Sequence, residues 1–347
     1  MPNEKLHKAK ATKNDEFYTQ YADIQSEMNA YLDFDPDVFR DKTVLLPCDD
    51  PEWSNFTKFF AQNFELFGLK KLISTSYAVE SKQYKKGYQP SLFETRSPSF
   101  DSDRTRTNGK IFTLTRGKAE RTDIESLKWE YLNGDGDFRS PEVTALRDEA
   151  DIIVTNPPFS LFREFLAWII EGKKHFIIIG NQTCITYKEV YHLIKDDKIW
   201  LGKGFNGGNA YFYSPFSQNY GHEVKNDKND LLKFRNCFWF TNIEHGKRHQ
   251  PLSLMTMTDN VKFSKHKEIK GVGYRKYDNY DALEVPRTDA IPSDYDGVMG
   301  VPISFLEKYN PEQFEIVKFR KGNDGKDLSV NGVCPFFRIL IKKRGMK

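Results

Sequence analysis

The chain has 347 residues, a formal net charge of +3 and a mean hydropathy of −0.66. No apolar run reaches the roughly 18 residues that a membrane-spanning helix needs, which argues against an integral membrane protein. The four cysteines are scattered and the N-terminus lacks the apolar core of a signal peptide. We therefore expect reduced thiols, a cytoplasmic protein and no membrane partner.

Charge is distributed unevenly along the chain. Residues 173–347 contain 29 Lys and Arg against 20 Asp and Glu, a formal charge of +9, whereas residues 1–172 carry −6. A basic half is typical of proteins that contact a polyanion such as nucleic acid, although a chance imbalance of solvated surface explains the same numbers.

The first 14 residues are polar, and we expect them to be flexible. Phe17, Tyr18 and Thr19 then lead into a helix that is predicted to end near Tyr31. Two aromatic residues at a helix entry are typical of a hydrophobic staple. They also suit a lid over a bound cofactor, and the residues alone leave both interpretations open.

The first strand is predicted over residues 43–46, with a helix over 55–67. The connection begins with Pro47, Cys48, Asp49 and Asp50. Ligands of open α/β sheets bind beyond the carboxyl ends of the strands, but an Asp in this place can equally cap the helix that follows. No glycine-rich fingerprint is present, which argues against a dinucleotide site.

After a second predicted strand, over residues 69–77, the stretch 81–110 is polar. It contains Lys85 and Lys86, which either contact a phosphate backbone or belong to a solvated loop. A short strand is predicted over residues 111–115.

Asp137 and Phe138 follow a predicted strand over residues 129–132 and a turn rich in Asp and Gly. An acid at a strand end can accept a hydrogen bond from the amino group of an adenine, with the phenyl ring against the base. An ordinary Asp-Gly turn accounts for the same residues equally well.

The apolar run 151–155 predicts a buried central strand, and an almost wholly apolar helix over 160–170 should pack against the sheet. Further strands are predicted over 175–180, 211–213 and 237–241. Alternating strands and helices indicate an α/β fold with a doubly wound, mostly parallel sheet.

The central strand ends in Asn156, Pro157, Pro158 and Phe159. The exocyclic amino group of adenine is a poor nucleophile because its lone pair is delocalised into the ring. Two acceptors on its N–H groups free that lone pair, and here they are the side-chain oxygen of Asn156 and the backbone carbonyl of Pro157, stiffened by Pro158. Phe159 offers a face on which the base can stack.

This motif therefore indicates transfer of a methyl group to an amino nitrogen. In duplex DNA the target base must first swing out of the helix, and a basic second lobe would hold the phosphates. The structural alternative is a simple strand terminator, since Asn and Pro both favour turns.

With these residues in place, the chain resembles the S-adenosylmethionine-dependent adenine-N6 DNA methyltransferases, and among them the EcoRI-type modification methylases. The resemblance extends over residues 14–345. It rests on residues 17–19 and 156–159, on the stretch 46–56 (LPCDDPEWSNF), and on residues 278–282 (DNYDA) and 294–302 (DYDGVMGVP).

The resemblance implies a Rossmann-like methyltransferase sheet that binds S-adenosylmethionine and needs no metal. The cofactor would be bordered by Phe17, Tyr18, Thr19, Pro47, Cys48, Asp49, Asp50, Asp137 and Phe138. The target base would be held by Asn156, Pro157, Pro158 and Phe159. The candidate DNA contacts are Lys85, Lys86, Arg248, Arg275 and Lys276.

We expect a catalytic domain over residues 15–245 and a smaller DNA target-recognition region over 246–347. The expected function is methylation of N6 of a flipped-out adenine at a short duplex site. We expect the protein to be a monomer and either part of a restriction-modification system or an orphan modification enzyme, with no need for physical contact with an endonuclease. The alternatives are methylation of an RNA base or a glutamine amide, and an inactive DNA-binding relative.

Overall fold

The computed structural model of the protein describes residues 17–78, 95, 97–117, 128–205, 208–213, 231–320, 328–335 and 337–345. The chain forms two compact units: residues 1–184 with 204–243, and residues 185–203 with 244–347. Residues 185–203, which we expected in the catalytic domain, thus belong to the second unit. The predicted flexible segment 1–14 lies outside the described residues.

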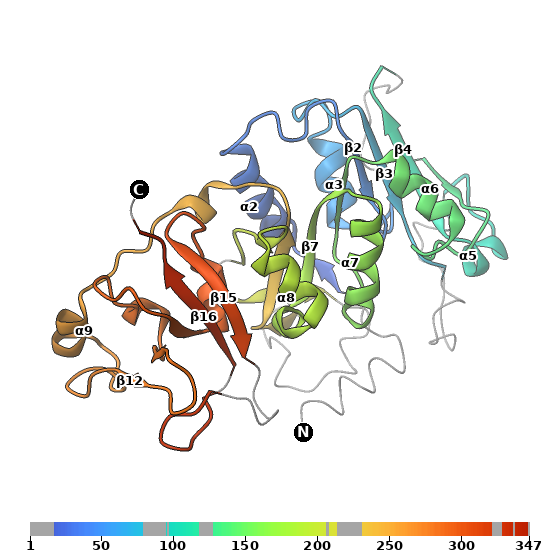
Figure 1. The fold of residues 1–347 in the computed structure, drawn as a ribbon. Coiled ribbons are helices and arrows are strands. Elements are labelled where there is room, and N and C mark those ends of the chain that lie inside the picture. The colour runs from blue at the N-terminus through green and yellow to red at the C-terminus, as the bar shows by residue number, and fades with distance from the viewer. Residues whose placement is uncertain are drawn as a thin grey trace. The chain divides into compact units, whose positions relative to one another are not determined.

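The first unit is a mixed α/β structure (Figure 1). Its helices are α2 (Tyr21–Leu32), α3 (Asn55–Gln62), α5 (Arg104–Thr107), α6 (Pro141–Glu149) and α7 (Phe162–Glu171), with a 3₁₀ turn, η3 (Phe159–Leu161). Its strands are β1 (Tyr18–Thr19), β2 (Thr43–Leu46), β3 (Lys71–Thr75), β4 (Lys110–Thr115), β5 (Trp129–Tyr131), β6 (Ile152–Thr155), β7 (His175–Asn181), β9 (Ala210–Tyr213), β10 (Leu232–Phe234) and β11 (Cys237–Thr241).

Seven strands of this unit form a sheet in the order β5-β4-β3-β2-β6-β7-β11. The four central strands, β3, β2, β6 and β7, are parallel. The pairs β3–β4, β4–β5 and β7–β11 are antiparallel. The α/β prediction is confirmed, but the prediction of a mostly parallel sheet holds only for the centre, because β4, β5 and β11 enter by connections that reverse the chain.

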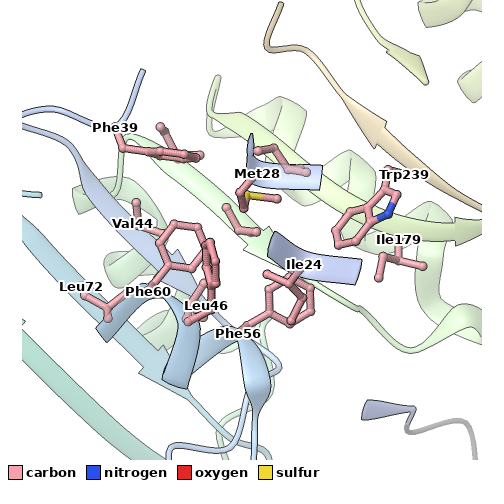
Figure 2. Close-up of a cluster of buried hydrophobic side chains, with 14 of the residues drawn as sticks. Ile24, Met28, Phe39, Val44, Leu46, Phe56, Phe60, Leu72, Ile179 and Trp239 are labelled. Atoms are coloured by element: carbon pink, nitrogen blue, oxygen red, sulfur yellow. The ribbon is translucent and has the colours of Figure 1, made fainter. Parts of the chain in front are cut away.

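Helices cover both faces of this sheet. Alternate residues of each central strand point to opposite faces, and those on one face, such as Val44 and Val154, pack with Ile24 of α2 and Phe56 of α3 in a large aromatic-rich cluster (Figure 2). The other face contacts α6 and α7.

Glycine at 180 matches this packing, since a Cβ there would lie 2.4 Å from the Phe162 ring of α7. Glycine at this position therefore allows α7 to pack closely against the sheet.

A small separate sheet lies in the same unit, with the order β1-β9-β10. β9 pairs antiparallel with both neighbours, and Tyr18 lies opposite Tyr213. Residues near the N-terminal end of the described chain are thus attached to a hairpin almost 200 residues further on.

The second unit contains α8 (Lys188–Lys195), α9 (Met257–Phe263) and the strands β8 (Trp200–Leu201), β12 (Arg275–Lys276), β13 (Leu283–Glu284), β14 (Met299–Pro302), β15 (Phe314–Arg320) and β16 (Arg338–Lys343). Five of these strands form a mixed sheet in the order β12-β13-β14-β16-β15. Within the described parts of both units, every helix is too short or too polar to cross a bilayer.

Candidate active site

A cavity of about 250 Å³ opens at the carboxyl ends of β2 and β6. The chain leaves β2 toward β3 on one side and later leaves β6 toward β7 on the other, so this is the point where the strand order reverses and where open α/β sheets bind ligands. The lining residues are Phe17, Tyr18, Thr19, Pro47, Cys48, Asp49, Asp50, Ser54, Phe56, Ser76, Tyr77, Gly136, Asp137, Phe138, Arg139, Asn156, Pro158, Ser160 and Leu161.

The cavity brings together five segments of the chain. They are β1 with the residue before it, the loop after β2, Ser76 and Tyr77 after β3, the turn before α6, and the end of β6 with the residues that follow it. Every predicted cofactor residue lines the cavity, and so do Asn156 and Pro158. Pro157 and Phe159 do not.

Asp49 lies at the centre of this arrangement and is only 6% exposed. One carboxylate oxygen accepts a hydrogen bond from the Ser54 hydroxyl at 2.6 Å, and the other accepts one from the Thr155 hydroxyl, also at 2.6 Å. Ser54 is also the N-cap of α3, where it accepts from the backbone N–H of Phe56. Asp49 therefore ties the ends of β2 and β6 to the start of α3.

Burial raises the pKa of Asp49 to about 7, against the lowering effect of the two hydroxyl donors, with the neighbouring Asp50 raising it further. The ammonium group of Lys110 pairs with Glu52 at 2.6 Å and lies 3.9 Å from Asp50. A buried carboxylate with a raised pKa favours a cationic ligand, because a positive charge restores the interactions lost with water.

Thr155→Val is expected to lower the free energy of unfolding by about 1–3 kcal/mol. Val has the same shape, but it leaves one buried Asp49 oxygen without its donor. Thr155→Ser keeps the hydroxyl and should retain most of the stability. Urea unfolding of both variants tests this, and a Thr155→Val protein as stable as the wild type would show that the hydroxyl bond to Asp49 contributes little.

Asp137 is engaged by an arginine. Arg139 donates to both carboxylate oxygens, at 2.9 and 2.7 Å, and also bonds Glu164 at 2.9 Å. Phe138 is 4% exposed and packs edge-on against Phe165 of α7. Asp137 and Phe138 line the cavity as expected, but their orientation is set by Arg139 and α7.

Gly136 gives the turn before Asp137 its shape. Its φ is +81°, and a Cβ there would lie 2.1 Å from the backbone oxygen of Ser76. Side chains other than glycine are disfavoured both by this φ and by the contact with backbone, which cannot move aside.

Gly136→Ala is expected to destabilise the protein by at least about 2 kcal/mol, through strain and overlap together. Gly134→Ala is the matched control, because its Cβ would meet only a Glu142 side-chain oxygen at 3.5 Å. Thermal unfolding compares the two, and a Gly136→Ala midpoint equal to that of the control would contradict the expectation.

In the side-chain amide of Asn156, the nitrogen has a hydrogen-bond partner and the oxygen has none. Its Nδ2 donates to the backbone oxygen of Phe17 at 2.6 Å, whereas its Oδ1 is buried without a hydrogen-bond partner. The hydroxyl oxygen of Thr19, also on the cavity wall, is a second buried polar atom without a partner. Buried polar atoms are nearly always paired, so two free acceptors on one wall indicate a polar ligand.

Phe159 points away from the cavity lining into a cluster of aromatic rings. Its ring centroid lies 5.4 Å from that of Phe17, 6.3 Å from Phe212 and 6.4 Å from Phe234. The described structure thus gives this ring a packing role between β1, β9 and β10.

Comparison with known proteins identifies the family of this chain. The sequence matches the family of the adenine-specific methyltransferase EcoRI over residues 5–344. It is 46% identical to the Type II methyltransferase M.EcoRI of Escherichia coli, over 99% of this chain and 98% of the relative. The chain belongs to the EcoRI family of adenine-specific DNA methyltransferases.

Other relatives are the Type II methyltransferases M.MpnI of Mycoplasma pneumoniae, 32% identical, and M.MgeORF184P of Mycoplasma genitalium, 33% identical, each over 98% of both chains. No solved structure matches the chain. The predictions of a methyltransferase, of the EcoRI type and of adenine specificity are confirmed.

The residues predicted to contact DNA in this EcoRI-family methyltransferase differ in solvent exposure. Arg275 and Lys276 of β12 are exposed in the second unit, Lys276 with an ion pair to Asp281 at 3.1 Å. Arg248 is only 4% exposed, with its guanidinium 3.8 Å from the centre of the Trp200 ring. Arg248 therefore has a packing role. Lys85 and Lys86 lie outside the described residues.

Several residues of the site are absent from our sequence-based set: Ser54, Phe56, Ser76, Tyr77, Gly136, Arg139, Ser160 and Leu161. Ser54 carried a readable signal, since a Ser directly before a helix is a preferred N-cap. Gly136 lies between two acids in a predicted turn. The contacts of Arg139 with Glu164 of α7 had no local signal in this methyltransferase.

Proposed function

We propose that the protein transfers the methyl group of S-adenosylmethionine to N6 of an adenine that has swung out of a short duplex DNA site. The observation that carries this proposal is Asn156, which lines the cavity and whose Oδ1 is buried without a hydrogen-bond partner. This oxygen is an acceptor with a fixed position and no partner, and the amino group of adenine is a donor that fits it.

The adenine amino group would donate one N–H to Asn156 Oδ1 and the other to the backbone carbonyl of Pro157. These two bonds draw the nitrogen toward a tetrahedral shape, so that its lone pair can attack. The same oxygens stabilise the positive charge that develops on the nitrogen. Such preorganised electrostatic contacts commonly contribute 10²–10³ in rate for each group.

The other parts of the cavity suit the cofactor, which supplies a methyl group activated by a sulfonium cation. Asp49 and Asp50 provide negative charge for the sulfonium and ammonium groups, and Thr19 provides a free hydroxyl oxygen. The further cofactor residues that we propose are Phe17, Tyr18, Pro47, Cys48, Asp137 and Phe138. The chemistry calls for no metal ion.

The first unit would then be a Rossmann-like catalytic domain. The second unit, which contains residues 246–347 together with residues 185–203, would recognise the target. Exposed Arg275 and Lys276 suit phosphate contacts, which hold DNA without reading its sequence. Lys85 and Lys86 remain candidates for the same role. Phe159 is proposed to support the flipped base from within its ring cluster.

We further propose that the protein acts in the cytoplasm as a monomer, as the modification enzyme of a restriction-modification system and without a physical complex with an endonuclease. The four cysteines are free thiols, which suits a reducing compartment. The rival substrates are an RNA base and a glutamine amide, which would present the same planar amino group to Asn156.

Incubation with S-adenosylmethionine labelled in its methyl group, together with duplex DNA, RNA or protein, tests the proposal. We expect label in DNA alone, recovered as N6-methyladenine after digestion to nucleosides. Label confined to RNA or protein would refute it, and tight DNA binding without any transfer would identify an inactive DNA-binding relative.

A further inference from the structure

The backbone carbonyl of Phe17 faces the amide of Asn156. The donor–acceptor distance from Asn156 Nδ2 to this oxygen is 2.6 Å, and the opposite atom, Oδ1, is buried and unpaired. Phe17 was assigned to the cofactor on the basis of the family resemblance. Its backbone also makes a direct contact with the residue that we propose to hold the target base.

This contact gives the Asn156 amide a single orientation. If the amide rotated by 180°, Oδ1 would face the Phe17 oxygen, and two acceptors in a buried site would repel each other with no proton between them. The nitrogen would then face the cavity and offer the adenine amino group a second donor. Only the observed orientation presents an acceptor.

Phe17 is itself held from several sides. Directly after it, β1 pairs with β9, with Thr19 opposite Phe212, and the Thr19 carbonyl accepts from Asn55 of α3 at 2.8 Å. The Phe17 ring packs 4.9 Å from the Phe234 ring and 5.4 Å from the Phe159 ring. The carbonyl is therefore fixed by a sheet, a helix and a ring cluster.

We propose that Phe17 is a positioning residue for catalysis, whose backbone carbonyl selects an amide at position 156 and orients its oxygen toward the adenine. The inference rests on the proposed role of Asn156. It also implies that a carboxylate at this position would be repelled by the Phe17 oxygen, even though a carboxylate has an acceptor to offer the base. A protonated carboxyl would not be repelled, because its O–H could donate to Phe17.

The variant N156D tests this selection. We expect N156D to be almost inactive at pH 8 and its kcat, relative to that of the wild type, to rise about tenfold for each pH unit on acidification, until the introduced carboxyl is half protonated. A ratio that is independent of pH, or that rises with pH, would overturn the proposal, because the ionised side chain would then be the competent form.

Other groups that line the cavity also titrate or carry charge, and they must be separated from this effect. They are the charged Asp49, Asp50, Asp137 and Arg139 and the weak acids Tyr18, Cys48 and Tyr77. All of them remain in the wild type and in N156S, which has a small hydroxyl in place of the carboxyl. The rise in kcat at acidic pH should appear in N156D and should be absent from the wild type and from N156S.

A second measurement is independent of methyl transfer and of the folding of N156D. In ¹⁵N-labelled wild-type protein without cofactor, one side-chain N–H of Asn156 should exchange slowly with water, its signal being assigned by its loss in N156S. Two freely exchanging protons would overturn the proposal. If the wild type methylates no DNA adenine, the proposed function fails while this exchange measurement still decides the role of Phe17.

Discussion

Asn156→Ala is expected to lower kcat by at least about 100-fold, because it removes one of the two acceptors that free the lone pair of the adenine nitrogen. Binding of S-adenosylmethionine should change little, since the residues proposed to hold the cofactor lie mainly at β1, in the loop after β2 and in the turn before α6. Single-turnover methylation of duplex DNA measures the chemical step, and equilibrium binding measures the cofactor.

Asn63→Ala is a matched control for this variant. Asn63 also donates its side-chain N–H to a backbone carbonyl, that of Phe59 at 2.8 Å, but it lies at the end of α3 and outside the cavity lining. It should lose some stability and keep the methylation rate. A rate for Asn156→Ala within tenfold of the wild type would show that Oδ1 does not hold the amino group.

Asp49→Asn is expected to change the pH dependence of stability by roughly 4 kcal/mol between pH 4 and pH 8. Burial raises the pKa of Asp49 in the folded protein to about 7, whereas an Asp in an unfolded chain titrates near 3.9. Between these values the folded state keeps a proton that the unfolded state has lost. The stability that Asp49 contributes is thus fully present at acidic pH and is lost as the pH rises through 7.

Asn cannot ionise, so the difference in unfolding free energy, Asp49→Asn minus wild type, should rise steadily from pH 4 to pH 8. Urea unfolding of both proteins at each pH gives this difference, in which the other titrating groups cancel. Asp50→Asn is the comparison variant, because it removes a neighbouring carboxylate and leaves the bonds of Asp49 to Ser54 and Thr155 in place. It should change the profile much less, since burial is the main cause of the raised pKa of Asp49 and the charge of Asp50 is a smaller one. A flat difference for Asp49→Asn would mean that the carboxylate is ionised at little cost.

The same variant should bind S-adenosylmethionine more weakly at pH 8, because the sulfonium and ammonium groups lose a buried anion. Asp49→Asn would thus raise the free energy of unfolding at pH 8 and weaken cofactor binding. Such an exchange of stability against activity is typical of residues that serve function. Calorimetric titration at pH 8 provides the measurement.

The core of the fold was predictable because its signals are local. The apolar runs of β2 and β6 have the bounds expected from the sequence or differ by one residue, since a short buried run followed by turn residues has few alternatives. The reversed direction of β4, which pairs antiparallel with both β3 and β5, was not predictable, because the direction of a strand depends on which edge of the sheet the returning chain meets. β1 has only two residues, too few for any periodic signal.

The place of a residue on the cavity was predictable where one segment carries the signal, as for Asn156 at the end of β6. It was not predictable where the chemistry depends on contacts between distant segments. Asp49 accepts from Thr155, 106 residues away, and no local pattern encodes that pair. For Phe159, a ring beside the proposed target-base residue suggests stacking, and no local signal indicated that the ring also packs near Phe17 and Phe212.

The pairing of β1 with β9 also determines when the enzyme can first work during its own synthesis. Tyr18 and Tyr213 are 195 residues apart, and the chain leaves the ribosome from its N-terminal end. The strand pairing that fixes the Phe17 carbonyl cannot form before β9 has emerged, long after Asn156 itself. Closing so long a loop is also slow. On the proposed roles of Asn156 and Phe17, a nascent chain that ends before β9 has the asparagine without the pairing that orients it, and we expect methylating activity only once most of the protein has been made.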